Sequence, residues 1–418
     1  MTSTVSLNRA SLRGYGWLAL LMLATLLLPW FEGDAIGRSA LAEGLSGAPW
    51  LLPIVAAAVM LLGHALINRE WRGHSLTVPL SAAAIGFVVL QALGIGLHGP
   101  SLPILLELFP QSEQGQRGLG IGGAVATVAM LGILAEGLVA RGFCRGERFA
   151  GICVVLIIAL LATFVFFPIA KLGALAFTGE DGSFALTPLI DRITDDRLWQ
   201  VVMNTLTVGV LSASLATAVG LALAIVVNRT SFRHKKLLRA VSILPIITPP
   251  FVVGVAIIVL FGRSGVFTQF SADLFGMQPG RWVYGLSGIL IAQVLAFTPV
   301  TFLVLSSALE AINPSLEEAS QTLGARSITT FRKVTWPLLR PGIATAFLLA
   351  FIESLSDFGN PLVLGGGFDV LSTRIFFAVV GAQQDLGNAS TLAIVLLSLT
   401  LMAFWLQQRW IGKASYVT

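Results

Sequence analysis

Two carboxylates inside an apolar stretch are the residues best suited to bind or move a charged solute. Glu353 and Asp357 lie four positions apart, so a helix would bring them onto one face. At about 1.5 Å per residue, Glu353 lies about 18 Å along that helix from Pro341, past the middle of a hydrocarbon core roughly 30 Å thick. A carboxylate at that depth costs at least about 2–3 kcal/mol unless it faces a cavity or a partner. The pair therefore predicts an acidic path for a cation, with a helix-packing pair or the outer end of the span as the alternative.

A segment interrupted by prolines is a second candidate for that path. Pro245, Pro249 and Pro250 fall inside the apolar run Leu238–Gly262. A broken membrane helix is tolerated only where it lines a cavity or is buried by neighbouring helices. We expect Pro249 and Pro250 to mark the break and to lie along the path, with packing as the equal alternative.

Other constellations of reactive residues are absent from the sequence. Cys144 and Cys153 predict neither a disulfide framework nor a metal site, and the four histidines have no ligand-like spacing. There is no nucleophile–base set and no Gly-rich phosphate loop followed by Lys and Ser or Thr. Because the basic residues are scattered in short loops, nucleic acid is not an expected partner. The sequence thus predicts a protein that is not an enzyme and holds no metal or cofactor of its own.

The longest polar stretch, Glu310–Gly342, lies between two apolar segments and begins with a predicted short helix. Asn313 can cap that helix, Pro314 suits its first position, and Gly324 supplies a stop. The helix carries acids in its first turn and apolar side chains at helical spacing: Glu317, Glu318, Leu316, Ala319 and Leu323.

A second short helix is predicted in the same stretch. Ser327 can cap it, Pro337 ends it, and its apolar side chains lie along one side: Ile328, Phe331 and Val334. Two short helices with a shared apolar face indicate a docking surface for a partner. An amphipathic loop that lies on lipid headgroups is the alternative that the pattern leaves open.

Composition places these features in a membrane protein. With 56% hydrophobic residues, 11% charged residues and a mean hydropathy of +0.86, the chain is unlike a soluble globular protein. Apolar runs recur along it and predict an all-α polytopic membrane protein with about ten transmembrane helices. The predicted spans are Tyr15–Phe31, Trp50–Ile67, Thr77–Leu97, Gly118–Ala140, Ala150–Ala170, Met203–Val227, Leu238–Gly262, Gly285–Ala308, Gly342–Val363 and Ser390–Leu406.

The distribution of basic residues predicts the orientation. With the N-terminus in the cytoplasm, most of the 26 Lys and Arg residues fall on the cytoplasmic side of these spans, as the positive-inside rule requires. Ten spans then return the C-terminus to the cytoplasm. The polar stretch Glu310–Gly342 also lies there, within reach of a cytoplasmic partner.

The polar stretch also resembles a known family. Glu318-Ala319-Ser320, three residues, Gly324, nine residues and then Val334-Thr335-Trp336-Pro337 are similar to the EAA loop of ATP-binding-cassette (ABC) importer permeases. The spacing matches throughout, and Trp336 is the one large departure from the family pattern. The resemblance covers roughly Leu198 to Trp410. It implies that the loop is a coupling helix seated in a cleft of a cytoplasmic ATPase, with these contact residues: Leu316, Glu318, Ala319, Ser320, Leu323, Gly324, Val334 and Pro337.

The resemblance also implies a function and a set of partners. The segment from Glu353 to Gly359 is similar to the corresponding segment of ferric-iron permeases. The implied protein is a permease subunit that moves ferric iron across the bacterial inner membrane, with ATP and Mg²⁺ bound by a partner ATP-binding subunit dimer and substrate delivered by a periplasmic binding protein. Alternatives are a permease for thiamine, polyamine or another small solute and, from a different class, an ion-coupled secondary transporter. The latter would need an inverted repeat, and the sequence contains none that we recognise.

The predicted organisation has two parts. Residues 1–148 form an accessory region of four spans without an assigned motif, and residues 149–418 form a six-helix type I ABC permease core with its coupling loop at 309–341. The chain has one such loop, whereas ferric-iron permeases often carry two fused cores. A second core is therefore expected from a homodimer, from another subunit or from a missing second half.

Overall fold

The protein is built almost entirely of helices. The computed structural model describes residues 3–33, 37–68, 70–96, 99–100, 103–177, 185–276, 278, 280–382 and 384–411. Within these ranges the paired strands are two residues long, β1 (Ile95–Gly96) and β2 (Gly99–Pro100), and form one antiparallel hairpin. The prediction of an all-α membrane protein is confirmed. The chain divides into two compact units, Met1–Pro168 and Ile169–Thr418, which we describe separately, and the domain boundary expected after residue 148 stays a prediction.

Eight helical segments in the described ranges are long and apolar enough to cross a membrane. They are Pro49–Ile67, Ile121–Ala140, Arg148–Ala176, Asp196–Arg229, Phe251–Phe275, Leu286–Ala311, Ser327–Ser356 and Leu386–Arg409. The first and third predicted spans correspond to shorter apolar helices, Gly14–Leu26 and Thr77–Ala92. The chain is therefore a multi-pass membrane protein.

The first unit is a bundle of apolar helices. Its core is formed by α1 (Ser3–Leu26), α3 (Leu52–Ile67), α4 (Thr77–Gly94) and α6 (Ile121–Ala140) around buried side chains that include Leu21, Trp30 and Met130. The remaining elements are α2 (Ala40–Ser46), η1 (Pro49–Leu51), α5 (Pro103–Leu108), η2 (Pro110–Gln114), η3 (Phe143–Gly146), α7 (Arg148–Leu161) and the π-helical η4 (Ala162–Phe166), which leads into α8 (Phe167–Ala176).

A cluster of three charged side chains, Glu136, Arg72 and Arg148, lies at one end of this bundle. The carboxylate of Glu136 on α6 is almost fully buried and pairs with two guanidinium groups. Nε of Arg72, in the loop before α4, lies 3.0 Å from Oε2 of Glu136, and Arg148 at the start of α7 pairs with both carboxylate oxygens. The cluster fixes the start of α7 against α6.

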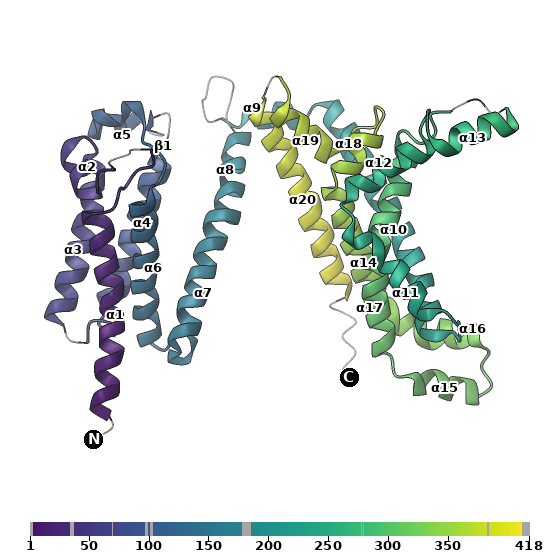
Figure 1. Cartoon of the computed structure of the whole chain (residues 1–418), viewed down its shortest axis with the longest axis horizontal. Coiled ribbons are helices and arrows are strands. Elements are labelled where there is room, and N and C mark those ends of the chain that lie inside the picture. The colour runs from purple at the N-terminus through teal and green to yellow at the C-terminus, as the bar shows by residue number, and fades with distance from the viewer. Residues whose placement is uncertain are drawn as a thin grey trace. The chain divides into compact units, whose positions relative to one another are not determined.

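The second unit is organised around three long helices. In Figure 1, α10 (Asp196–Arg229), α14 (Leu286–Ala311) and α17 (Trp336–Ser356) pack against one another, and α20 (Leu386–Ile411) lies beside α17. Gly220 permits a close approach of α10 to α14, because a Cβ there would lie 2.3 Å from Oγ1 of Thr301 on α14. Shorter elements complete the unit: α9 (Thr187–Ile193), α18 (Gly359–Leu364) and α19 (Leu371–Val380).

The proline-containing segment is broken as its sequence predicts. The apolar run Leu238–Gly262 forms α11 (Lys235–Ile243), the 3₁₀ turn η5 (Leu244–Ile247) and α12 (Pro250–Phe261) rather than one continuous helix. Pro249 is the N-cap of α12 and Pro250 its first residue, where the missing N–H removes no helical hydrogen bond. The next helix, α13 (Val266–Phe275), extends away from the other helices of the unit (Figure 1).

Three predicted helix boundaries are wrong. The second short helix does not stop at Pro337, because α16 (Ser327–Thr330) continues through the π-helical η6 (Phe331–Thr335) directly into α17. Its N-cap is Arg326 rather than Ser327. Pro337 lies in the first turn of α17, right after the wider π turn, where its ring does not break the helix. The ninth predicted span also ends early, at Ser356 rather than Val363, because Asp357 has an extended backbone (φ −69°, ψ 111°).

Candidate functional site

The predicted coupling segment lies at one end of the second unit, where α14 ends and α17 begins (Figure 1). Its first helix, α15 (Pro314–Thr322), begins as predicted: the side chain of Asn313 accepts a hydrogen bond from the backbone N–H of Ser315 at 3.1 Å. Pro314 occupies the first position. Local capping chemistry therefore defines the start of this helix.

Gly324 ends α15 in a Schellman motif. Its φ of +85° is left-handed, a conformation that costs a side-chain-bearing residue about 1–2 kcal/mol. The N–H of Ala325 donates to the carbonyl of Ser320 at 3.1 Å, and that of Gly324 donates to the carbonyl of Gln321 at 2.9 Å. Both ends of α15 are thus fixed by their own hydrogen bonds.

The apolar side chains of this segment point into solvent. Leu316 is 48% exposed, Leu323 is 89% exposed and Ile328 on α16 is 64% exposed, and Glu318 and Ala319 are exposed as well. A leucine exposed on a rigid helix end leaves apolar area available to a partner. Helical spacing places Leu316, Ala319 and the C-cap residue Leu323 on one side of α15, whereas Glu318 is exposed on another side.

Three other predicted contact residues have different surroundings. The hydroxyl of Ser320 lies 3.0 Å from that of Thr330, so it joins α15 to α16. Val334 and Pro337 are half-buried at the base of the continuous helix that leads into α17. Ser320 therefore connects α15 to α16, and Val334 and Pro337 are less exposed than Leu316 and Leu323.

Sequence reasoning missed the residues that attach α15 to the long helices. Arg229, the last residue of α10, has its Nε 3.0 Å from Oε2 of Glu317. The other carboxylate oxygen of Glu317 accepts a hydrogen bond from the hydroxyl of Thr335 at 2.7 Å. An arginine that closes a long apolar span was the available signal, but its partner lies far away in the sequence.

Asp357, near the opposite end of α17, is held by a set of hydrogen bonds. It is the C-cap of α17, one residue beyond the last helical residue, and its N–H still donates to the carbonyl of Glu353 at 3.0 Å. Its Oδ1 accepts from the backbone N–H groups of Gly359 (3.1 Å) and Asn360 (3.3 Å). Its Oδ2 accepts from Nδ2 of Asn360 at 2.8 Å and from Nε2 of Gln293 at 3.0 Å. Four neutral donors thus saturate the carboxylate and fix the start of α18.

The same amide of Gln293 extends the network to two more helices. Its Oε1 accepts hydrogen bonds from the hydroxyls of Ser212 on α10 (2.8 Å) and Ser354 on α17 (2.6 Å). Gln293 is fully buried, so these polar contacts replace water inside the helix bundle. Asp357 is therefore part of the framework that joins α10, α14, α17 and α18.

Glu353 has a different environment from Asp357. It is exposed, and its carboxylate has no hydrogen-bond or ion-pair partner among the residues that the structure describes. Both acids line a pocket of about 470 Å³, together with Phe251, Phe297 and Phe358. Phe251 directly follows the Pro249–Pro250 break, so the break places the start of α12 beside the pocket. Pro249 does not line the pocket, and the side chain of Pro250 lies outside the described residues. In the described ranges no three His, Cys, Asp or Glu side chains are grouped to hold a metal ion.

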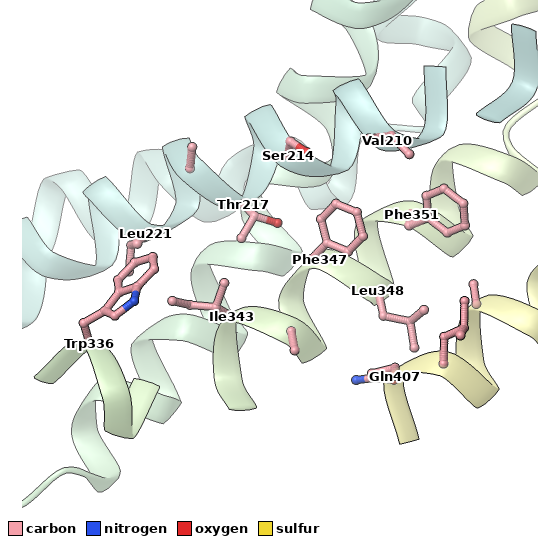
Figure 2. A pocket seen from close by; sticks show the side chains of 14 residues that line it. Val210, Ser214, Thr217, Leu221, Trp336, Ile343, Phe347, Leu348, Phe351 and Gln407 are labelled. Atoms are coloured by element: carbon pink, nitrogen blue, oxygen red, sulfur yellow. The ribbon is translucent and has the colours of Figure 1, made fainter. Parts of the chain in front are cut away.

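A larger groove in the second unit is lined mainly by apolar side chains. It measures about 800 Å³ and lies between α10, α17 and α20, with Thr217, Phe347 and Leu348 among the side chains that face it (Figure 2). Its lining is almost entirely apolar, and Gln407 provides one of its few polar groups. An apolar lining cannot compensate a charge, so of these two spaces the smaller acidic pocket is the one suited to a cation.

Known proteins share this arrangement. The model of the family described as "binding-protein-dependent transport system inner membrane component" matches residues 216–411, which include α14, α15 and α17. A solved chain of a bacterial alginate ABC transporter, in complex with an alginate pentasaccharide-bound periplasmic protein, has the same fold with a TM-score of 0.57 at 18% identity. The match covers 67% of this chain and 97% of that one.

Curated relatives extend the match beyond the family segment. The ferric transport system permease protein FbpB of Actinobacillus pleuropneumoniae is 38% identical over 83% of this chain, and this chain spans about half (52%) of that protein's length. The molybdenum transport system permease protein ModB of Escherichia coli (strain K12) is 30% identical over 53% of this chain and 97% of its own length. The chain therefore belongs to the family of binding-protein-dependent transport system inner membrane components, the permeases of ABC importers.

Proposed function

We propose that this chain is a permease of an ABC importer that moves ferric iron across the bacterial inner membrane. The observation that carries the proposal is its 38% identity to a ferric transport permease over 83% of the chain. The α15 segment, with its exposed leucines, and the acidic pocket supply the two working surfaces that such a protein needs. The chain itself does no chemistry in this proposal.

The first working surface would receive a cytoplasmic ATPase. In the proposed complex, Leu316, Ala319 and Leu323 insert into a cleft of the ATP-binding subunit, and Glu318 borders the contact. ATP and Mg²⁺ are bound by that partner dimer. Support comes from the 89% exposure of Leu323 beside the fixed turn at Gly324. Covering such an apolar side chain with a partner removes it from water and lowers the free energy of the complex.

The second working surface would conduct the substrate. Relatives carry names of both ferric and molybdenum transport, so the substrate class must be argued from the pocket. Glu353 is unpaired by any described residue, and Asp357 is bonded only by neutral groups, so the pocket keeps formal negative charge. Negative charge attracts a cation and repels an oxyanion such as molybdate. The pocket therefore favours ferric iron, while thiamine or a polyamine, which are also cations, are the alternatives.

Transport would also require partners outside the cytoplasm and a second core. We propose that a periplasmic binding protein docks on the outer loops, around α13 and the turn before α19. Because the chain spans about half of its ferric relative, a second permease core completes the path, as a second copy, another subunit or a further segment of the chain.

Orientation is tested by thiol labelling in a background without Cys144 and Cys153. Single cysteines at Ser231 and Ser327 should be shielded from an impermeant reagent in intact cells, because we place α10's end and α16 in the cytoplasm. A cysteine at Asp273 on α13 should react. Labelling of Ser327→Cys from outside would reverse the orientation and remove the ATPase contact.

The function itself is tested by uptake of radiolabelled ferric iron in cells that lack the chromosomal gene. The wild-type chain should restore ATP-dependent uptake of ferric iron, and molybdate uptake should stay unchanged. Gly324→Trp should abolish uptake, because a bulky residue is strained at φ +85° and alters the docking surface. Gly142→Trp is the matched control: its φ is +93° and a Cβ there would meet nothing within 4 Å, but it lies in the turn between α6 and η3 of the first unit. Wild-type uptake in Gly324→Trp would refute the coupling role.

A further inference from the structure

Arg229 lies at the end of the second unit that carries α15. It is the last residue of α10, and its Nη2 donates to two backbone carbonyls at the C-terminal end of α14, Leu309 (2.8 Å) and Ile312 (3.2 Å). The carbonyls at a helix C-terminus lack partners inside the helix and carry partial negative charge. A guanidinium is the side chain best shaped to serve several such acceptors at once.

The same guanidinium reaches the first helix of the coupling segment. Nε of Arg229 lies 3.0 Å from Oε2 of Glu317 on α15, with the side chains 21% and 15% exposed. Oε1 of Glu317 accepts from the hydroxyl of Thr335 in η6, the π turn that leads into α17. One arginine–glutamate pair therefore joins four elements: α10, α14, α15 and the base of α17.

The space around this pair is not filled by apolar packing. A pocket of about 540 Å³ lies between α15 and the ends of the long helices, lined by Arg229, Leu309, Glu317, Ile328 and Thr335 among others. None of the residues of α15 is buried, so few apolar contacts attach it to the unit. Its attachment depends on polar contacts, the Glu317 pair and the Ser320–Thr330 hydrogen bond.

We propose that the Arg229–Glu317 pair is the link that transmits movement of α15 to the membrane helices. This inference rests on the proposed function. Neighbouring acids then have separate roles: Glu318 is exposed toward the partner, and Glu317 is turned inward to Arg229 and Thr335. Arg229 and Glu317 are positioning residues. Without them the ATPase still binds α15. When the ATPase dimer closes, however, α15 tilts over the pocket and does not move α10, α14 and α17 together.

The experiment measures three quantities on the same membranes: recovery of the ATPase with the permease, ATP hydrolysis, and substrate uptake. Arg229→Met and the milder Glu317→Gln should retain ATPase recovery and hydrolysis but lower uptake about tenfold, within the roughly 5- to 150-fold range of coupling between sites. Arg239→Met and Glu310→Gln are matched controls, because that pair joins α11 to α14 with the side chains 48% and 51% exposed. Both controls should transport normally.

A charge exchange sharpens the test. In the double variant Arg229→Glu with Glu317→Arg the ion pair can re-form, but the carboxylate introduced on α10 cannot donate to the carbonyls of Leu309 and Ile312, so uptake should stay low. Full recovery in the exchange would overturn the link to α14. Equal loss of ATPase recovery and uptake in Glu317→Gln would also overturn the proposal, because the pair would then only shape the docking surface.

The same assay separates this inference from the proposed function. If Gly324→Trp abolishes uptake while Arg229→Met and Glu317→Gln transport normally, the link is wrong and the coupling surface stands. If Gly324→Trp and Arg229→Met both transport normally, the proposed coupling function itself is wrong.

Discussion

The two units differ in how they compensate the acids of their long helices. In the first unit, Glu136 is 1% exposed and is paired with two guanidinium groups, those of Arg72 and Arg148. In the second unit, Asp357 accepts hydrogen bonds from neutral donors only, and Glu353 beside it has no described partner. The first arrangement carries a formal charge of plus one, and the second keeps its negative charge.

Under the proposed function, this difference separates a structural role of the acid from a role in the substrate path. A carboxylate neutralised by arginines is fixed in place and offers nothing to a passing cation, so the Glu136 cluster serves to hold α6 and α7 together. A carboxylate bonded by amides keeps its position and its charge. Asp357 therefore gives the pocket shape and negative potential together, and Glu353 adds a carboxylate that is free to approach a cation.

The largest expected effect follows from breaking the neutralised cluster. Glu136→Ala leaves the guanidinium groups of Arg72 and Arg148 without their carboxylate, and loss of one partner from a buried pair costs about 3–5 kcal/mol. We expect a marked fall in the thermal stability of the detergent-solubilised protein and in its yield. Glu310→Ala, which breaks the exposed pair with Arg239, is the control and should change stability by about 1 kcal/mol or less. Equal melting of the two variants would contradict the structural role of Glu136.

The next effect concerns the acid bonded by neutral donors. Asp357→Ala leaves the amides of Gln293 and Asn360 and two backbone N–H groups without their acceptor. Hydrogen bonds to charged groups contribute about 1.5–3 kcal/mol each, so we expect a loss of about 3 kcal/mol after local rearrangement. Glu353→Ala, four residues earlier, removes a larger side chain without a described partner and should leave the melting temperature unchanged. A similar loss in both variants would show that Glu353 also has a structural role.

A third prediction separates charge from structure in the pocket. Glu353→Gln keeps the size of the side chain and removes its charge. Uptake of ferric iron should fall roughly tenfold, equivalent to about 1.4 kcal/mol of lost attraction, while stability and ATPase recovery stay normal. Glu353→Asp keeps the charge and should retain most of the uptake. Normal uptake in Glu353→Gln would remove this residue from the path and would weaken the argument for a cationic substrate.

The sequence predicted the parts of the site that depend on neighbouring residues. The cap at Asn313, the turn at Gly324 and the proline break before α12 all follow from local backbone chemistry, and the structure confirms each. The exposed face of α15 was predictable for the same reason, since helical spacing alone decides which side chains share it.

The sequence could not predict features that depend on distant partners. Asp357 leaves the helix because Gln293 and the start of α18 bind its carboxylate, and helical spacing gives no sign of that competition. The attachment of Glu317 to Arg229 likewise needs the ends of α10 and α15 to meet. Pro337 was a misleading signal, because the π turn before it removes the conflict that would end a regular helix.

The smallest predicted effect concerns the hydrogen bonds by which Gln293 on α14 connects α10 to α17. Oε1 of the buried Gln293 accepts from the hydroxyls of both Ser212 and Ser354, so either one can satisfy this oxygen. Ser212→Ala and Ser354→Ala should each lower stability by about 0.5–1.5 kcal/mol, the usual contribution of one hydrogen bond. The double variant leaves a buried acceptor without a partner, so its loss should exceed the sum of the single losses. Thermal unfolding of the four proteins measures this coupling. Additive losses would mean that Gln293 finds another donor, and the network would then not connect α10 to α17 through this residue.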